Sequence, residues 1–340
     1  MTRCLLAFAV LTAFLGCGGD KPPAKDPATV QVGSNPPVAD TTPPSSPGAD
    51  DPWGKEPPKD PNEPPDLTET KALADKACPI VKVPYYWKFT KANKTSYLLG
   101  SRHLGVPLAK MPVKVKEQIL KSSQVIFETP PGDDSEDAPG DGSSLADKLG
   151  PKLWEKYKKL VGSKVAENVE HGKPSVAILM LMMMYEDKTS ALDLEIEQLA
   201  SDSKLKTGGL ESSAFQSKLH EELLDVRMLK ATIEGTTDRK TMEKDSFDDL
   251  QEYCAGTDDS PGMDAHAIKQ MKDAGYTDAE IKRLDERMLD ERNLKWIPQL
   301  DKLFTAGNVF VVVGADHLSG PKGVVKLMQA KGFKAERISP

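Results

Sequence analysis

Residues 308–314 restrict the fold more than any other segment, because they read Asn-Val-Phe-Val-Val-Val-Gly and are almost entirely apolar. A strand with apolar side chains on both faces is expected where both faces of its sheet are covered, as in parallel sheets packed between helices. The chain must therefore build at least one layer of helices on each side of a sheet.

Strand and helix patterns alternate along the rest of the chain. Residues 84–89 and 95–100 predict a hairpin with its turn at 91–94, and residues 124–128 and 204–207 predict two further short strands. Helical spacing or apolar runs of helical character mark residues 113–122, 145–169, 176–185, 192–200 and 214–237. The predicted fold class is α/β (α+β), a layered domain over residues 67–340 with a central mixed sheet flanked by helices.

One short pattern, an apolar strand followed by Gly-x-x-His, occurs twice. Gly100 and His103 end the first copy, and Gly314 and His317 end the second. The carboxyl ends of strands in open α/β sheets are where ligands usually bind, and Glu128 follows a third strand in the same way. Two imidazoles and a carboxylate at one sheet edge suit a transition metal. The alternative is that each histidine is an independent core or surface group.

Arg292 is predicted to project from an apolar helix face. Residues 277–280 have the form of a capping box, and in the helix that follows Leu284, Met288, Arg292 and Trp296 share one stripe. A guanidinium in that position needs an oxygen partner, because an unpaired buried charge is very costly. Its partner is either a structural carboxylate, from Glu128 or Glu211, or the carboxylate of a substrate.

Residues 97–128 and 308–340 resemble the TraB/GumN family, which also includes the Tiki proteins, and the resemblance extends more loosely from about Tyr85 to the C-terminus. It implies that His103 and His317 match the two motif histidines and Glu128 the acid after the second strand. The pair Arg292-Asn293 resembles an Arg-Asn pair of the family, and the Tiki branch consists of metal-dependent proteases. The resemblance implies the fold and the site residues more directly than it implies the reaction.

The central segment of the chain adds a further acid. Residues 192–200 and the Leu-Glu pair ending at Glu211 resemble an acidic helix and a Leu-Glu pair of the same family. Glu211 is predicted to be a metal ligand or general base, or else an acid that stabilises a helix N-terminus. Asp193 and Glu197 are four residues apart on one helix face and are assigned to a solvated or salt-bridged surface. Polar surroundings assign His171, His220 and His266 to the surface as well.

These features predict a metal-dependent hydrolase, most specifically a peptidase acting on a peptide or protein substrate. His103 and His317 would bind a divalent transition metal (Mn, Co or Zn), Glu128 or Glu211 would accept the proton, and Arg292 and Asn293 would bind substrate. Two rival classes are a non-catalytic peptide or signal-molecule binding protein and a metal or haem carrier. A net charge of −7 disfavours a nucleic-acid partner.

The N-terminus predicts export and anchoring. Residues 1–16 have one positive charge and a short apolar run, as in a signal peptide, and Phe14-Leu15-Gly16-Cys17 resembles a bacterial lipobox. Lipidation of Cys17 would place the protein on the cell-envelope membrane, with the outer membrane favoured because Gly18 and not Asp follows. The alternative is an ordinary cleaved signal with an incidental cysteine.

Residues 17–66 predict a tether, because prolines recur in them and little of the segment could be buried. Beyond this tether only Cys78 and Cys254 remain of the four cysteines. In an oxidising compartment they could form a disulfide or stay as two thiols, and the sequence does not show whether they approach each other.

Lipidation at Cys17 is the first testable prediction. The Cys17→Ser protein should lose its lipid and move from the membrane fraction to the soluble fraction, because no other anchor is predicted. Fractionation with metabolic lipid labelling measures both effects, and an unchanged membrane fraction for the variant would refute the prediction.

Overall fold

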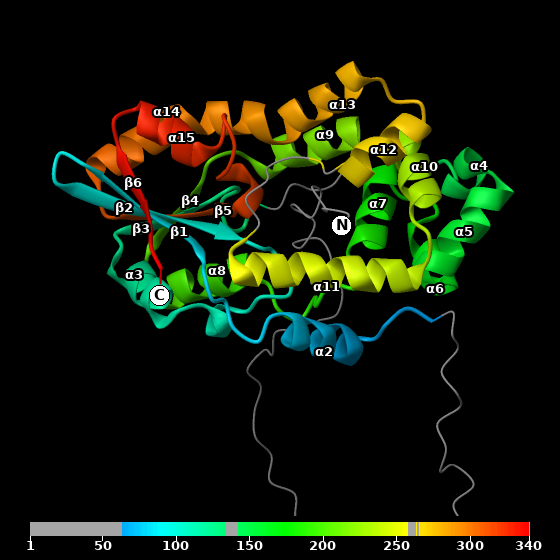
Figure 1. Ribbon diagram of the computed structural model, residues 1–340, viewed down its shortest axis with the longest axis horizontal. Helices are drawn as coiled ribbons and strands as arrows, with labels where there is room; N and C mark the ends of the chain where they lie inside the picture. Colours follow the sequence, from blue (N-terminus) through cyan, green and yellow to red (C-terminus); the bar gives the residue numbers. More distant parts are fainter. Residues whose placement is uncertain (1–62, 134–141, 258–262, 264, 340) are drawn as a thin grey trace, which may run out of the picture.

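A six-stranded mixed sheet forms the centre of the protein, with helices on both faces and a larger group of helices beyond one edge (Figure 1). The computed structural model describes residues 63–133, 142–257, 263 and 265–339. The predicted leader, Cys17 and most of the tether lie outside these ranges. Within them, no helix combines the length and apolar character needed to cross a membrane.

The strand order in the sheet is β4-β3-β5-β2-β1-β6. The strands are β1 (Tyr85–Lys91), β2 (Lys94–Ser101), β3 (Gln124–Phe127), β4 (Lys206–Gly209), β5 (Val309–Gly314) and β6 (Lys334–Arg337). The four neighbours β4, β3, β5 and β2 are parallel, whereas β1 is antiparallel to both β2 and β6. The carboxyl ends of the four parallel strands therefore meet at one edge.

The structure confirms the predicted strands, although β4 lies two residues beyond the predicted 204–207 and β6 was not predicted. All six residues of β5 are buried, as its apolar sequence requires. The hairpin turns at Ala92 and Asn93, whose φ angles of 48° and 61° fit the left-handed two-residue turn that matches strand twist. The mixed sheet with helical layers agrees with the predicted α/β class.

The helices divide between two hydrophobic cores. The first core surrounds the sheet and includes residues from α2 (Leu67–Ala77), α3 (Val113–Lys121), α8 (Leu192–Asp202), α11 (Arg239–Ala255), α14 (Glu291–Ala306) and α15 (Val324–Ala330). The second lies in what we call the helical lobe: α4 (Leu145–Leu149), α5 (Pro151–Val161), α6 (Ser163–Val169), α7 (Pro174–Met182), α9 (Ser213–Leu223), α10 (Val226–Gly235), α12 (Ala265–Asp273) and α13 (Asp278–Asp285). In Figure 1 the lobe lies at the end of the molecule away from the β1–β2 turn.

Two helix predictions need correction. Residues 214–237 were expected to form one helix, but the chain breaks into α9 and α10 at Asp225, whose side chain accepts a hydrogen bond from the Met228 N–H as an N-cap. Helix α11 was not predicted, because its sequence is strongly polar and buries only four residues. Tertiary packing of that narrow face stabilises it.

The helix that bears Arg292 begins as predicted, with a capping box between Thr277 and Glu280. A π-helical turn at Glu286–Asp290 then joins α13 to α14. Such a turn inserts a residue into the helical register and often occurs at functional sites. As a result both Arg292 and Asn293 are buried on the side that faces the sheet.

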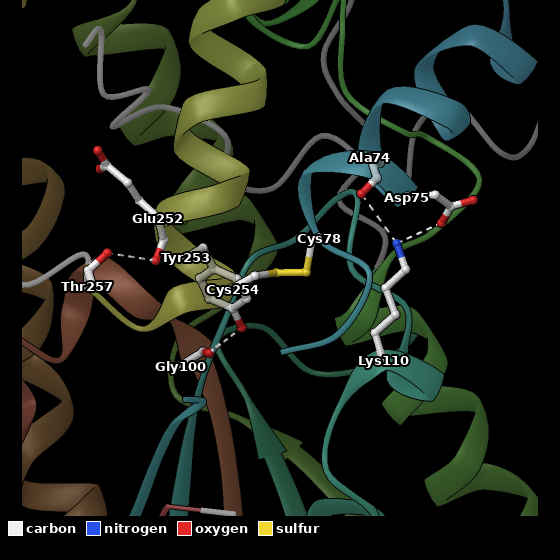
Figure 2. The surroundings of a disulfide bond; sticks show 9 residues. All are labelled: Ala74, Asp75, Cys78, Gly100, Lys110, Glu252, Tyr253, Cys254 and Thr257. Atoms are coloured by element: carbon white, nitrogen blue, oxygen red, sulfur yellow. Dashed lines mark hydrogen bonds and ion pairs between the residues drawn. A yellow bond between two sulfur atoms is a disulfide. The ribbon is translucent and has the colours of Figure 1, made fainter. Parts of the chain in front are cut away.

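A disulfide joins Cys78, just after α2, to Cys254 near the end of α11, with a Cα–Cα distance of 5.7 Å (Figure 2). It closes a loop of 176 residues, and both residues are buried. The neighbouring Tyr253 donates its hydroxyl hydrogen to the Gly100 carbonyl at 2.9 Å (Figure 2). The bond therefore fixes the start of the domain beside the first Gly-x-x-His motif.

Removing this disulfide should destabilise the domain. The double variant Cys78→Ala/Cys254→Ala should lose about 2–4 kcal/mol of unfolding free energy, because its unfolded chain is no longer cross-linked. Urea denaturation measures the change, and reduced wild-type protein should match the variant. Equal stability of oxidised wild type and double variant would show that the bond adds nothing.

Candidate active site

Each of the four parallel strands delivers one candidate residue to the same sheet edge. His103 follows β2, Glu128 follows β3, Glu211 follows β4 and His317 follows β5. The Glu211 N–H also donates to the Glu128 carbonyl at 2.9 Å, which holds the two acidic segments together. The structure thus brings together all four residues that the sequence placed at strand ends.

Gly100 is required because the two motifs pack closely. A Cβ at this position would lie 2.6 Å from Leu318 Cδ1 and 3.0 Å from Ala315 Cα, which are both in the second motif. The close approach of the segment after β5 therefore requires a residue without a side chain at this position.

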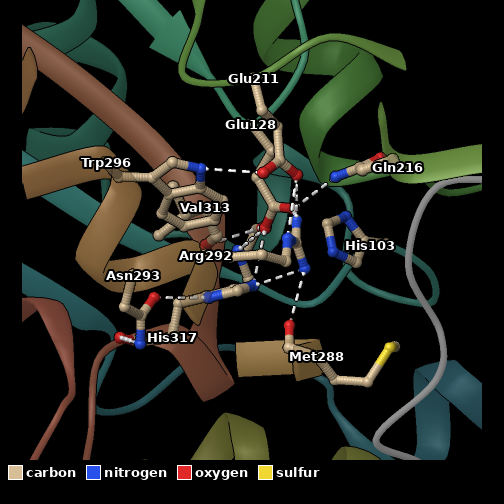
Figure 3. Close-up of polar contacts among 12 residues, drawn as sticks. His103, Glu128, Glu211, Gln216, Met288, Arg292, Asn293, Trp296, Val313 and His317 are labelled. Carbon is tan, nitrogen blue, oxygen red and sulfur yellow. Dashed lines mark hydrogen bonds and ion pairs between the residues drawn. The ribbon is translucent and has the colours of Figure 1, made fainter. Parts of the chain in front are cut away.

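Arg292 lies at the centre of the site, with only 1% of its surface exposed (Figure 3). Its Nε and Nη2 donate to Glu211 Oε1 at 2.9 and 2.6 Å, and Nη2 also donates to Glu128 Oε2 at 2.5 Å. Nη1 donates to the Met288 carbonyl at 3.2 Å. The predicted carboxylate partners are therefore both present, and one guanidinium bridges them.

Glu128 is fixed by contacts on both of its oxygens. Oε1 accepts from the Gly314 N–H at 2.7 Å, and Oε2 accepts from Gln216 Nε2 at 2.9 Å as well as from Arg292. Burial raises the pKa of Glu128, but the charge of Arg292, the nearby His317 and His103 rings and the Gly314 N–H lower it to about 2. The carboxylate is ionised at neutral pH and ties β3 to β5.

The His317 ring is fully buried and held in one orientation. Its Nδ1 lies 2.7 Å from Asn293 Oδ1, so Nδ1 carries the hydrogen and donates it, while Nε2 accepts from Arg292 Nη1 at 3.1 Å. The ring also packs on Trp296, with centroids 4.4 Å apart. Burial and the charge of Arg292 lower the pKa of His317 to about 3, so the imidazole is neutral.

His103 is the more accessible of the two motif histidines, with 18% of its side chain exposed. Its Nδ1 lies 2.8 Å from Asp193 Oδ2, and Asp193 Oδ1 accepts from the Ser101 hydroxyl at 2.8 Å. Burial lowers the pKa of His103, but the Asp193 carboxylate outweighs it and raises the pKa above its usual value. Asp193 is therefore ion-paired, which was one of the two expected alternatives, but α8 places it against the first motif and not in open solvent.

Two buried residues of α9 were not predicted to lie near the site. Gln216 and His220 are one helical turn apart and both buried, and Gln216 bonds to Glu128. The expectation that His220 is exposed is wrong: burial and the charge of Arg292 lower the pKa of His220 to about 4. His171 is exposed as predicted, and the side chain of His266 lies outside the described part of the structure.

The donors fit a divalent transition metal in their chemistry. Each motif imidazole has Nδ1 bonded to a side-chain oxygen, the arrangement that fixes metal-binding histidines and directs Nε2 to the ion. Among the described residues, however, no three His, Cys, Asp or Glu side chains lie close enough to hold an ion. Arg292 Nη1 contacts His317 Nε2, so an ion bound at that nitrogen would have to displace the guanidinium.

Replacing Arg292 should be strongly destabilising. Arg292→Met leaves the Glu128 and Glu211 carboxylates buried without a cation, which should cost about 3–5 kcal/mol of unfolding free energy. Arg283→Met is a matched control, because Arg283 pairs with Glu291 on the surface of the same helical segment and should contribute less than about 1 kcal/mol. Urea denaturation compares the two, and similar losses in both variants would contradict this role of Arg292.

Comparison with known proteins identifies the family. A family model for the TraB/PrgY/gumN family matches residues 85–337, from the first strand to the last. The searches of curated proteins and of solved structures gave no match. The matched region covers most of the chain and contains both Gly-x-x-His motifs, Glu128, Glu211 and the Arg292-Asn293 pair. The chain therefore belongs to the TraB/PrgY/gumN family.

Proposed function

We propose that this protein is a metal-dependent hydrolase of the bacterial cell envelope that cleaves peptide bonds. One observation carries the proposal: two imidazoles at the ends of adjacent parallel strands each have Nδ1 held by a side-chain oxygen, beside two buried carboxylates. Histidines that bind metal usually donate their other ring N–H to a carboxylate or carbonyl oxygen in this way.

The charge balance supports a cation at this edge. Glu128 and Glu211 share the single positive charge of Arg292, and His317 is neutral. One negative charge therefore remains in a largely buried site, and a divalent ion would compensate it. His103 and His317 would hold the ion, whose identity we leave among Mn, Co and Zn. When bound, such an ion would polarise the scissile carbonyl and lower the pKa of a water molecule.

The residues around the ion would have separate roles. Glu128 is bonded to the backbone of β5, so we assign it to positioning, whereas Glu211 is held by side chains only and is our candidate proton acceptor. Asn293 would orient His317 and Asp193 would orient His103. Substrate would approach from the side of His103, which is partly exposed. Direct contacts of Arg292 and Asn293 with substrate remain a prediction.

The envelope location is proposed from the leader sequence. Lipid on Cys17 would anchor the protein to the membrane, and residues 18–62 would separate the domain from its surface. The disulfide agrees with an oxidising compartment. The rival reading, a binding protein without turnover, uses the same residues and differs only in the fate of the peptide.

Loss of either motif histidine should remove the metal and the activity. His103→Ala and His317→Ala should each lose most of the bound metal, and the double variant should lose little more, because ligands of one ion act as a unit. Elemental analysis of the purified proteins and cleavage of a peptide library measure the two effects. His171→Ala is the matched control: His171 is exposed and is not part of the proposed site, so this variant should retain full metal content and activity.

Two other results would change the assignment. Full metal content in either single variant would refute the shared site. Stoichiometric metal and tight peptide binding without cleavage would favour the binding protein over the hydrolase.

A further inference from the structure

A second site lies in the helical lobe, where a cavity of about 140 Å³ opens between α7, α10, α11, α12 and α13. Figure 1 shows these helices grouped beyond the sheet edge. Much of the lining is methionine: Met182, Met228, Met242, Met263, Met271 and Met288. Methionine side chains are flexible and polarisable, so they adapt to apolar groups of different shapes.

The charged part of the lining is acidic, and neutral threonine, serine and glutamine side chains make up the rest of its polar part. Glu186, Asp245, Asp249 and Asp285 all line the cavity. Glu186 forms an ion pair with Arg102 at 2.7 Å, but in the described residues no ion pair involves the three aspartates. The acidic side of the cavity is therefore suited to a cationic ligand, whose charge would favour the ionised form of these carboxylates.

Asp285 adds an independent observation. Its carboxylate accepts a hydrogen bond from the Met263 backbone N–H, but its Oδ1 atom is buried and has no hydrogen-bond partner among the residues that the structure describes. A buried carboxylate oxygen without a donor is unfavourable, so this atom is suited to accept a hydrogen bond from a ligand. The methionine lining favours an apolar group. In the described part of the chain, the carboxylates without an ion pair and the Asp285 oxygen without a donor favour a cationic hydrogen-bond donor, so a fitting ligand has both features.

We propose that this cavity binds a small apolar amine, with the apolar group against the methionines and the ammonium at Asp285 and its neighbouring acids. The apolar group would be about as large as a leucine or phenylalanine side chain, because an apolar cavity of ~150 Å³ holds one benzene ring. The site is separate from the Arg292 cluster, and amine binding in the cavity does not depend on peptide hydrolysis at that cluster.

The electrostatics of Asp249 agree with a cationic ligand. Burial raises the pKa of Asp249 to about 7, the charge of Arg102 lowers it, and Glu186, Asp245 and Glu252 raise it further. A nearby ammonium would favour the ionised form.

The cavity also borders the candidate active site. Met288 lines the cavity, and its carbonyl accepts a hydrogen bond from Arg292. Glu186 lines it as well and pairs with Arg102, the residue before His103. A ligand in the cavity would therefore contact Met288, which bonds to Arg292, and Glu186, which pairs with the residue before His103.

Calorimetric titration tests the proposal with three probes of similar shape: 2-phenylethylamine, 2-phenylethanol and phenylacetate. The protein is the mature chain carrying Cys17→Ser, so that no detergent competes with the probes. The protonated amine should bind with one-to-one stoichiometry and at least about tenfold more tightly than the alcohol, because it adds a charge-assisted hydrogen bond. Phenylacetate should bind most weakly.

Asp285→Asn should reduce amine affinity about tenfold and leave alcohol affinity unchanged. Asp248→Asn is the matched control, because Asp248 lies on α11 but pairs with Lys244 and does not line the cavity. If Asp285→Asn does not fold, Asp245→Asn provides the same comparison from α11. Equal affinity for amine and alcohol, preference for the carboxylate, or binding of none of the probes would overturn the proposal, and none of these outcomes bears on peptide cleavage.

Discussion

The ion pair that the Arg292 guanidinium makes with both Glu128 and Glu211 is the interaction on which the rest of the structure depends. Each carboxylate follows a different strand, and the arginine comes from α14, so one buried cation joins two strand ends to the helix that covers them. Removing Arg292 would leave two uncompensated carboxylates in a buried site. Arg292 therefore holds the segments that follow β3 and β4 beside α14.

The same constraint shapes the chemistry at this edge. Arg292 contacts His317 Nε2, and Glu128 reaches the backbone of Gly314 at the start of the second motif. The imidazoles are thus held beside a cluster with one net negative charge. Asn293 and Asp193 complete the arrangement by fixing the Nδ1 side of each ring. A cation that enters would meet ordered donors, but it would compete with Arg292 for His317.

Local patterns predicted much of this arrangement. The apolar run of β5, the turn at Ala92-Asn93 and the helical stripe containing Arg292 each depend on neighbouring residues, so the sequence revealed them. The parts that were missed depend on contacts between distant segments. Asp193 was assigned to a solvated or salt-bridged surface, but α8 places it against the first motif. His220 was assigned to the surface, but it is buried where α9 packs near Glu128. The pairing of Cys78 with Cys254 required knowledge of where α11 runs.

The central claim is that His103 and His317 serve one metal ion, and anomalous X-ray diffraction from crystals of the manganese- or zinc-loaded protein tests it most directly. A single anomalous peak is expected at coordination distance from Nε2 of both rings, with Nδ1 still bonded to Asp193 and Asn293 and with Arg292 moved away from His317 Nε2. Crystals that show no peak between the rings at saturating metal, with Arg292 still donating to His317, would contradict the claim.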